Sequence, residues 1–368
     1  MRLFMPIPSF PSEISLHGSD SSFLTGDALS RGWGFISADY RLLIPSTGHE
    51  ILRDVKSLFA FLGDQDGGLN KELRALGCPH QIDPNRLFVG GSSAGAYPAF
   101  LAALFAQPKP KGFFSLYGVG GDLLSEFYVP LLRTKRQAAE GQEVDAEIEA
   151  SSETAPAPVE EIVEQMPELK KFLTPTPDDV KLMRSVADVP FSLAPRVIAS
   201  GFRPTSSPSS PSSRSASPST TITTDLIPGT NIPGHRVRIS GALRGALHHA
   251  GVYLDYLMGM PGLTAKLGEI PEHEDRCAYV AACDKCRYLF PQIWIDKDFP
   301  PSIFIHGDTD VVVSIEESKR VVEMLQKVGV DCVFIVAEGK GHQLEERASP
   351  EVYVQYIKPV VEFLKQLP

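Results

Sequence analysis

The sequence lacks a basic stripe of the kind that binds nucleic acid or an anionic membrane. Of its 368 residues, 35 are Lys or Arg and 45 are Asp or Glu, which gives a formal net charge of −10 at pH 7. Residues 140–168 hold ten of the acidic residues and no basic one, so this stretch accounts for the imbalance. We therefore expect neither nucleic acid nor a membrane surface as a partner.

Long apolar runs and an even set of cysteines are also missing. The N-terminal run MRLFMPIPSF is broken by Pro6 and Pro8, and it is too short for a signal peptide or for a helix that spans a bilayer. The five cysteines are an odd number, whereas the disulfide framework of a secreted chain normally uses an even set. These absences predict a cytoplasmic protein without a targeting or membrane segment.

Hydrophobic residues make up 43% of the chain, which is enough to fill a sizeable core. Two predicted insertions interrupt this core-forming sequence. Residues 134–160 are charged and Ala-rich, and residues 203–224 are a Ser/Pro/Thr tract; neither can bury enough apolar surface to offset its ordering entropy. We expect residues 1–133 and 299–368 to form two parts of one core, with 134–298 as an insertion or cap region that includes both tracts.

Outside these tracts, short apolar runs alternate with helical patterns. The expected strands are 33–40, 85–91, 111–118, 301–307 and 331–339. The expected helices are 48–62, 94–106, 314–329 and 350–367. Strands separated by helices of this length need crossover connections, which predicts an α/β fold with a mostly parallel sheet flanked by helices. Ligands of such sheets bind beyond the carboxyl ends of the strands.

The run FVGGSSAGAY at 88–97 passes from a predicted strand through a turn into a predicted helix. A nucleophilic serine on such a turn needs small residues two positions before and after it, because the strand and helix backbones pass close by. Ser93 has Gly91 and Gly95 at these positions, whereas Ser92 would have an alanine on its later side. Ser93 is therefore the candidate nucleophile, and the alternative is a glycine-rich turn with an unreactive serine.

A serine nucleophile needs a base and an acid, and both occur in the predicted order on loops after later strands. FIHGDTDVVVS offers Asp308 and Asp310, and AEGKGHQLEE offers His342 after the last strand. Asp310 stands further from the strand end, where it can turn towards His342, so we expect Asp310 to be the acid and Asp308 to cap the turn. Alone, His342 could equally be a histidine of a surface loop.

Four motifs together resemble the α/β-hydrolase superfamily, in particular the esterase and lipase branch related to hormone-sensitive lipase. They are GWGFISADYRLLIP (32–45), DPNRLFVGGSSAG (83–95), FPPSIFIHGDTDVVV (299–313) and EGKGHQLE (338–345). The resemblance implies hydrolysis of a small-molecule carboxylic ester without a cofactor. It implies Ser93 as nucleophile, Asp310 as orienting acid and His342 as general base.

The resemblance also implies an oxyanion hole, with the backbone N–H of Ala94 as one donor. The other donor normally comes from a loop of H-G-G-G type, and in ISLHGSDSSFLTGD (14–27) His17 and Gly18 match that pattern while Ser19 and Asp20 replace the later glycines. Gly18 is the candidate second donor. No run before Ile14 is predicted as one of the first two strands of the family's sheet, so these strands are expected to be missing.

Two alternatives to ester hydrolysis remain. One follows from the missing glycines of the oxyanion loop, and the other from the fact that a Ser-Asp-His triad serves several reactions. An impaired oxyanion loop would leave a non-catalytic binding protein with the same fold. Acyl transfer or peptide hydrolysis could use the same three side chains.

Three further motifs have a structural alternative. Cys283 and Cys286 form a C-x-x-C pair, but structural zinc normally needs two ligand pairs, so we predict free thiols and no metal. Residues 241–263, with parts of 120–132, are predicted either to line an acyl pocket or to pack as ordinary core. His248 and His249 are predicted to be structural.

Overall fold

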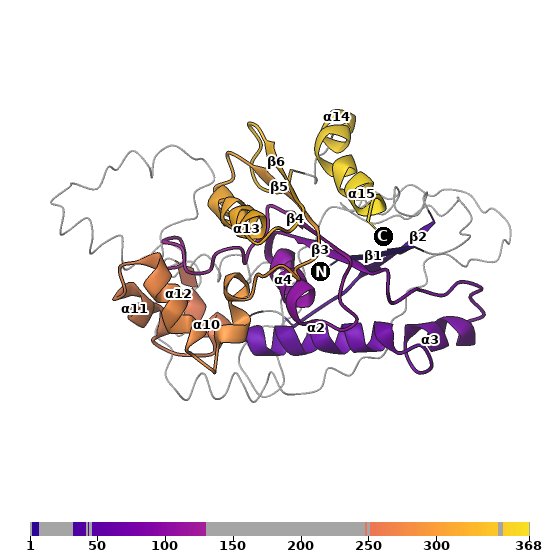
Figure 1. The fold of residues 1–368 in the computed structure, drawn as a ribbon, viewed down its shortest axis with the longest axis horizontal. Coiled ribbons are helices and arrows are strands. Elements are labelled where there is room, and N and C mark those ends of the chain that lie inside the picture. Colours follow the sequence, from indigo (N-terminus) through magenta and orange to yellow (C-terminus); the bar gives the residue numbers. More distant parts are fainter. Residues whose placement is uncertain are drawn as a thin grey trace, which may run out of the picture.

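The computed structural model describes residues 2–6, 32–41, 43, 46–129, 247–248, 251–344 and 349–367, with side chains from residue 32 onward (Figure 1). A single six-stranded sheet, with strand order β2-β1-β3-β4-β5-β6, lies at its centre. The strands are β1 (Arg2–Pro6), β2 (Trp33–Ser37), β3 (Phe88–Ser92), β4 (Gly112–Leu116), β5 (Ser302–Gly307) and β6 (Cys332–Ala337). Pairs from β3 to β6 are parallel, and β1 runs antiparallel to both β2 and β3. The predicted mostly parallel sheet is confirmed.

Strand β1 corrects the expectation that no strand precedes residue 14. Arg2 pairs with Ser37 on one side and with Gly90 on the other, so the N-terminal run lies inside the sheet rather than at its edge. The sequence analysis considered this run only as a signal peptide or a membrane-spanning helix and predicted no strand in it. Pro6 occupies the last paired position, opposite Trp33 of β2, where a missing N–H interrupts the ladder least.

Helices cover both faces of the sheet (Figure 1). The first part of the chain contains α2 (Gly48–Gly63), α3 (Leu69–Ala75), the 3₁₀ turn η1 (Ser93–Gly95) and α4 (Ala96–Phe105). The middle part contains α10 (Tyr253–Met258), α11 (Leu263–Gly268), α12 (His273–Ala281) and the 3₁₀ turns η3 (Arg287–Leu289) and η4 (Pro291–Ile293). The last part contains α13 (Ile315–Lys327) and the continuous run α14 (Pro350–Val352), η5 (Tyr353–Ile357, π-helical) and α15 (Lys358–Lys365).

Alternation along the strands divides the core into two layers. Phe113 and Phe304 pack with α2, α4 and α13 on one face of the sheet. Phe114 and Ile305 point to the opposite face, where they pack with α15. Because successive strand residues face opposite sides, these buried strands have apolar residues on both faces, as expected for a parallel sheet covered by helices.

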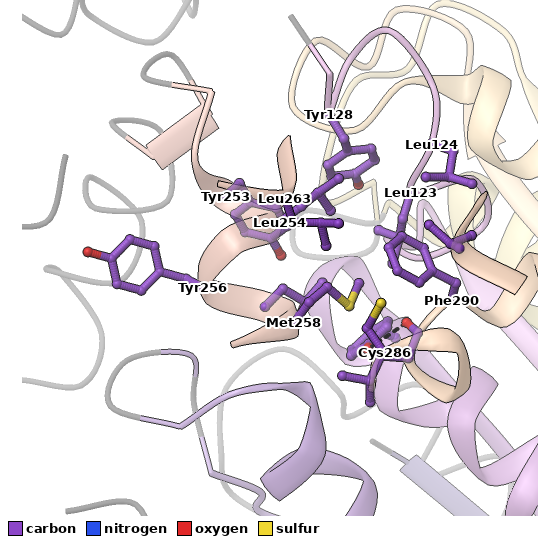
Figure 2. Close-up of a cluster of buried hydrophobic side chains, with 14 of the residues drawn as sticks. Leu123, Leu124, Tyr128, Tyr253, Leu254, Tyr256, Met258, Leu263, Cys286 and Phe290 are labelled. Atoms are coloured by element: carbon purple, nitrogen blue, oxygen red, sulfur yellow. Dashed lines mark hydrogen bonds between the residues drawn. The ribbon is translucent and has the colours of Figure 1, made fainter. Parts of the chain in front are cut away.

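A third cluster joins the segment after β4 to α10, α11 and α12 (Figure 2). Leu123, Leu254 and Met258 are fully or almost fully buried in it. Ordinary core packing, one of the two interpretations of 241–263, therefore describes the side chains of this cluster. His248 stacks on Tyr253 with ring centroids 4.1 Å apart, which is a structural arrangement.

The predicted insertions 134–160 and 203–224 lie outside the described residues, as does His249. Within the described part of the chain, every helix is too short or too polar to cross a lipid bilayer.

Candidate active site

Ser93 lies on a strained turn between β3 and α4. Its φ is 50°, in the left-handed region that residues other than glycine rarely adopt. A Cβ atom at Gly91 would lie 2.1 Å from the carbonyl oxygen of Gly95, so the turn requires glycine at position 91. The carbonyl of Ser93 accepts a hydrogen bond of 3.0 Å from the N–H of Val119, which fixes the turn to the segment after β4. These contacts bear out the close backbone approach inferred from the sequence.

The structure brings the three predicted side chains together. His342 Nε2 lies 2.9 Å from Ser93 Oγ, and His342 Nδ1 lies 2.8 Å from Asp310 Oδ2. Asp310 lies on the loop after β5, and His342 on the loop after β6, at the carboxyl edge of the sheet. These two loops are in contact, since the Thr309 N–H donates to the Lys340 carbonyl at 3.2 Å.

Asp310 is held in place by more than His342. Its Oδ1 accepts the backbone N–H groups of Val312 at 2.8 Å and Val313 at 3.0 Å. Its Oδ2 also lies 3.3 Å from His306 Nε2. Burial by itself raises the pKa of Asp310, but the hydrogen bonds from His306, His342 and Val313 and the charge of His342 outweigh burial and hold this pKa well below its usual range. Asp310 is therefore a carboxylate at neutral pH.

His306, on β5, is a buried partner that the sequence analysis did not single out. Its Nε2 lies 2.9 Å from the carbonyl oxygen of Val313, which can only accept, so Nε2 carries a proton. Its Nδ1 lies 2.8 Å from the hydroxyl oxygen of Ser318. The Nε2–H is thus shared between Val313 and Asp310. The only sequence signal was its position in a predicted strand, four residues before Asp310.

Asp308 and Tyr117 take structural positions around His342. Asp308 accepts the backbone N–H of Gly339 at 2.7 Å and so ties together the loops after β5 and β6, in agreement with the predicted structural rather than catalytic position. The Tyr117 ring packs edge-on against the imidazole of His342, with centroids 4.6 Å apart. Tyr117 has a φ of 39°, and nothing in the sequence predicted this contact.

Of the two candidate oxyanion donors, the structure describes one. Ala94 is exposed and lies in η1, directly after Ser93. Gly18 lies outside the described residues, together with the rest of the loop 14–27.

Glu317 of α13 is a buried carboxyl group that the sequence analysis did not identify. Its Oε2 accepts the N–H groups of Gly120 at 2.7 Å and Gly121 at 3.0 Å, and its Oε1 accepts the Tyr128 hydroxyl at 2.5 Å. Burial raises the pKa of Glu317 to about 7, although these hydrogen bonds oppose the rise. Glu317 thereby anchors the segment whose Val119 N–H holds the carbonyl of Ser93.

A second histidine–carboxylate pair connects α12 to the same segment. His273 Nε2 lies 2.9 Å from both oxygens of Asp122. On its other side, His273 Nδ1 faces Cys277 Sγ at 3.6 Å and Arg320 at 3.1 Å. The hydrogen bonds to Asp122 and Cys277 are the main causes that raise the pKa of His273 to about 9. Arg320 also lies 3.5 Å from Glu274.

The five cysteines are free thiols in the structure. Among the described residues, no group of three or more His, Cys, Asp and Glu side chains is arranged to hold a metal ion.

Comparison with family models gave one match, in which residues 246–367 match the prolyl oligopeptidase family. The matched third of the chain includes Asp310 and His342, and it supports the resemblance to hydrolases stated above. No curated protein matches the sequence.

Solved structures gave matches of low identity. An acetyl ester-xyloside bifunctional hydrolase from Caldicellulosiruptor lactoaceticus is 14% identical, with a TM-score of 0.40, over 89% of this chain and 69% of its own. Carboxyl esterase 2 from the mycorrhizal fungus Tuber melanosporum is 13% identical, with a TM-score of 0.39, over 92% and 68%. A monoacylglycerol lipase from Paleococcus ferrophilus is 14% identical, with a TM-score of 0.36, over 94% and 90%. None of these names the branch related to hormone-sensitive lipase, which stays a prediction.

Proposed function

We propose that this protein, which has the α/β-hydrolase fold, is a serine hydrolase that cleaves carboxylic esters through an acyl-enzyme intermediate. The observation that carries the proposal is the position of His342, whose two ring nitrogens lie 2.9 Å from Ser93 Oγ and 2.8 Å from Asp310 Oδ2. Residues that are 249 positions apart meet at hydrogen-bond distance beside a strained serine. A structural histidine needs no such serine.

The geometry assigns a role to each side chain. Asp310, kept ionised by its surroundings, accepts the Nδ1 proton of His342 and so leaves the Nε2 lone pair directed at the Ser93 hydroxyl. As Ser93 Oγ attacks the ester carbonyl carbon, His342 takes its proton and then delivers that proton to the departing alcohol. Water, deprotonated by the same imidazole, attacks the acyl-enzyme, and the acid product and free Ser93 result.

The developing negative charge needs hydrogen-bond donors. The backbone N–H of Ala94 directly follows the nucleophile, in a residue that is exposed at the turn, which supports its role as an oxyanion donor. Gly18 is proposed as the second donor. We further propose that 134–298 is a cap region between the core parts 1–133 and 299–368, and that the protein works in the cytoplasm, the compartment that its odd number of cysteines favours.

Labelling by a fluorophosphonate probe tests the proposal, because the probe reacts with an activated serine, which displaces fluoride from phosphorus. We expect the wild-type protein to be labelled and Ser93→Ala to be unlabelled. Ser92→Ala is the matched control, since it removes a neighbouring hydroxyl while leaving His342 opposite Ser93, and it should remain labelled. An unlabelled wild type would support the non-catalytic binding protein instead. Loss of labelling in Ser92→Ala alone would identify Ser92 as the nucleophile.

Peptide-bond hydrolysis is the second candidate, because residues 246–367 match the prolyl oligopeptidase family. The same three side chains could attack an amide, so the distinction lies in the substrate. We expect turnover of p-nitrophenyl esters of short acids and little turnover of aminoacyl p-nitroanilides. Turnover of the anilides alone would favour the peptidase.

A further inference from the structure

Cys283 and Cys286 are the two thiols of the C-x-x-C motif, and their sulfur atoms lie 3.1 Å apart. They occupy a tight turn after α12, in which the Cys286 N–H donates to the Cys283 carbonyl at 3.2 Å. The sulfur atoms of a disulfide lie about 2.05 Å apart, so bond formation needs an approach of only about 1 Å. The backbone turn has already brought the two side chains together.

We propose that Cys283 and Cys286 are a redox-active dithiol that exchanges with a small-molecule disulfide of the glutathione type and closes to an intrachain disulfide. This inference is independent of the proposed ester hydrolysis, since it involves neither Ser93 nor His342. The other described cysteines have different surroundings: Cys277, for example, lies against the imidazole of His273.

The two thiols differ in exposure, and this difference orders the reaction. Cys283 is half-buried and can be reached from solvent, whereas Cys286 is fully buried. Burial is the largest cause that raises the pKa of Cys286, and the neighbouring Cys283 thiol adds to it. Cys283 is therefore the thiol that meets the external disulfide, and Cys286 is the thiol that completes the reaction.

In the first step the Cys283 thiolate attacks one sulfur of oxidised glutathione, the glutathione disulfide bond breaks, and one glutathione thiolate leaves and takes up a proton. In the second step Cys286 loses its proton and attacks the Cys283 sulfur, which releases the second glutathione. In total, two protein thiols are oxidised, one glutathione disulfide is reduced to two thiols, and the two protons end on these thiols.

The environment of Cys286 favours the closed form. A protein disulfide is a strong oxidant when the protein stabilises the thiolate that reduction of the disulfide releases. Here burial disfavours the Cys286 thiolate, so the reduced form lacks that stabilisation. Cys286 belongs to the buried cluster that also contains Met258 and Phe290, so closure would change packing inside this cluster (Figure 2).

The wild-type protein itself provides the test. It is equilibrated at several ratios of oxidised to reduced glutathione, quenched with acid, denatured, treated with a maleimide and weighed intact. The chain has five cysteines, so the reduced form should carry five maleimides and the disulfide form three. Because each turnover releases two thiols, the absolute concentration matters, and with oxidised and reduced glutathione each at about 1 mM we expect the disulfide to exceed the dithiol by about tenfold or more. Peptide mapping should join positions 283 and 286.

Three variants separate this outcome from others. Cys286→Ser should stop at the mixed disulfide and gain one glutathione on Cys283, and Cys283→Ser should form no disulfide. Cys277→Ser, the matched control from the same segment, should close as the wild type does. Five maleimides on the wild type at every ratio, a stable glutathione adduct on the wild type, or loss of closure in Cys277→Ser would each overturn the proposal.

Discussion

The molecule contains two histidine–carboxylate pairs of nearly equal geometry. His342 lies 2.8 Å from Asp310, and His273 lies 2.9 Å from Asp122. In both pairs the carboxylate is buried and the imidazole is partly exposed. The difference lies at the second ring nitrogen, which meets the Ser93 hydroxyl in the first pair.

In the second pair, the other nitrogen of His273 meets Cys277 and the cationic Arg320. The Arg320 guanidinium can only donate, so its contact with Nδ1 at 3.1 Å occupies the lone pair of this nitrogen and leaves none free to accept a proton from a hydroxyl. The comparison teaches that a carboxylate beside an imidazole does not define a general base. The imidazole also needs a free lone pair and a reactive hydroxyl at hydrogen-bond distance.

The two carboxylates provide the test with the largest expected effect. Asp310→Asn should lower kcat for a p-nitrophenyl ester by about 10⁴-fold, because the amide no longer selects the tautomer that leaves Nε2 unprotonated. Asp122→Asn should change kcat by less than about threefold, since Asp122 touches neither His342 nor Ser93. Steady-state kinetics of both variants decide the matter. An equal loss in both would remove the distinction between the pairs.

The strained turn is the next test, because only the first pair has one. Gly91→Ala adds a Cβ that would lie 2.1 Å from the Gly95 carbonyl oxygen, so the turn must shift. A displacement of about 1 Å at Ser93 should slow fluorophosphonate labelling roughly a hundredfold. Gly262→Ala is the control, since Gly262 has a φ of +82° but no atom within 4 Å of the added carbon. It should cost stability and leave the labelling rate unchanged; equal slowing in both would contradict us.

The pH dependence of the free energy of unfolding tests the second pair, His273 and Asp122. Folding raises the pKa of His273 from an ordinary value of about 6.5 to about 9, so this pair stabilises the folded state fully below about pH 6.5. Its contribution is lost as the pH rises through about 9. Because His273 is partly exposed, we expect a loss of about 1 kcal/mol between pH 6 and 9.5. Urea unfolding should show this loss in the wild type and not in His273→Gln; parallel curves would show that the pair does not titrate as described.

The smallest effect is expected for the thiol beside His273. Cys277→Ser replaces a weak donor 3.6 Å from Nδ1 with a shorter hydroxyl, so the free energy of unfolding should change by only about 0.5 kcal/mol, with kcat unaltered. Urea unfolding and ester kinetics on the same preparation measure both. A marked loss of kcat would give the second pair a part in catalysis.

Much of the fold could be predicted because local pattern and tertiary structure agree. The strands 88–92 and 302–307 are apolar on both faces, and helix 48–63 has a capping box in which Thr47 and Glu50 satisfy each other. Strand β1 could not be predicted, since its apolar run contains a proline and its place in the sheet depends on two partners distant in sequence.

The candidate site likewise contains residues that could be predicted from the sequence and residues that could not. The proposed nucleophile, acid and base each follow a recognisable strand, and so could be named from local sequence. Glu317 could not, because its partners Gly120 and Tyr128 lie 197 and 189 positions away and have no motif of their own. The pairing of Asp122 with His273 spans 151 positions for the same reason. Buried polar contacts across such distances are set by the completed packing rather than by any local pattern.

The separation of 249 positions between Ser93 and His342 has a consequence for the protein during translation. A ribosome that adds about 5–20 residues per second takes roughly 12–50 s to travel from one to the other. Throughout that interval the emerging polypeptide already carries the proposed nucleophile but lacks the proposed base. A chain that stalls or is cut before residue 342 could fold much of its first half and still be chemically silent, so reactivity would appear only on nearly finished molecules.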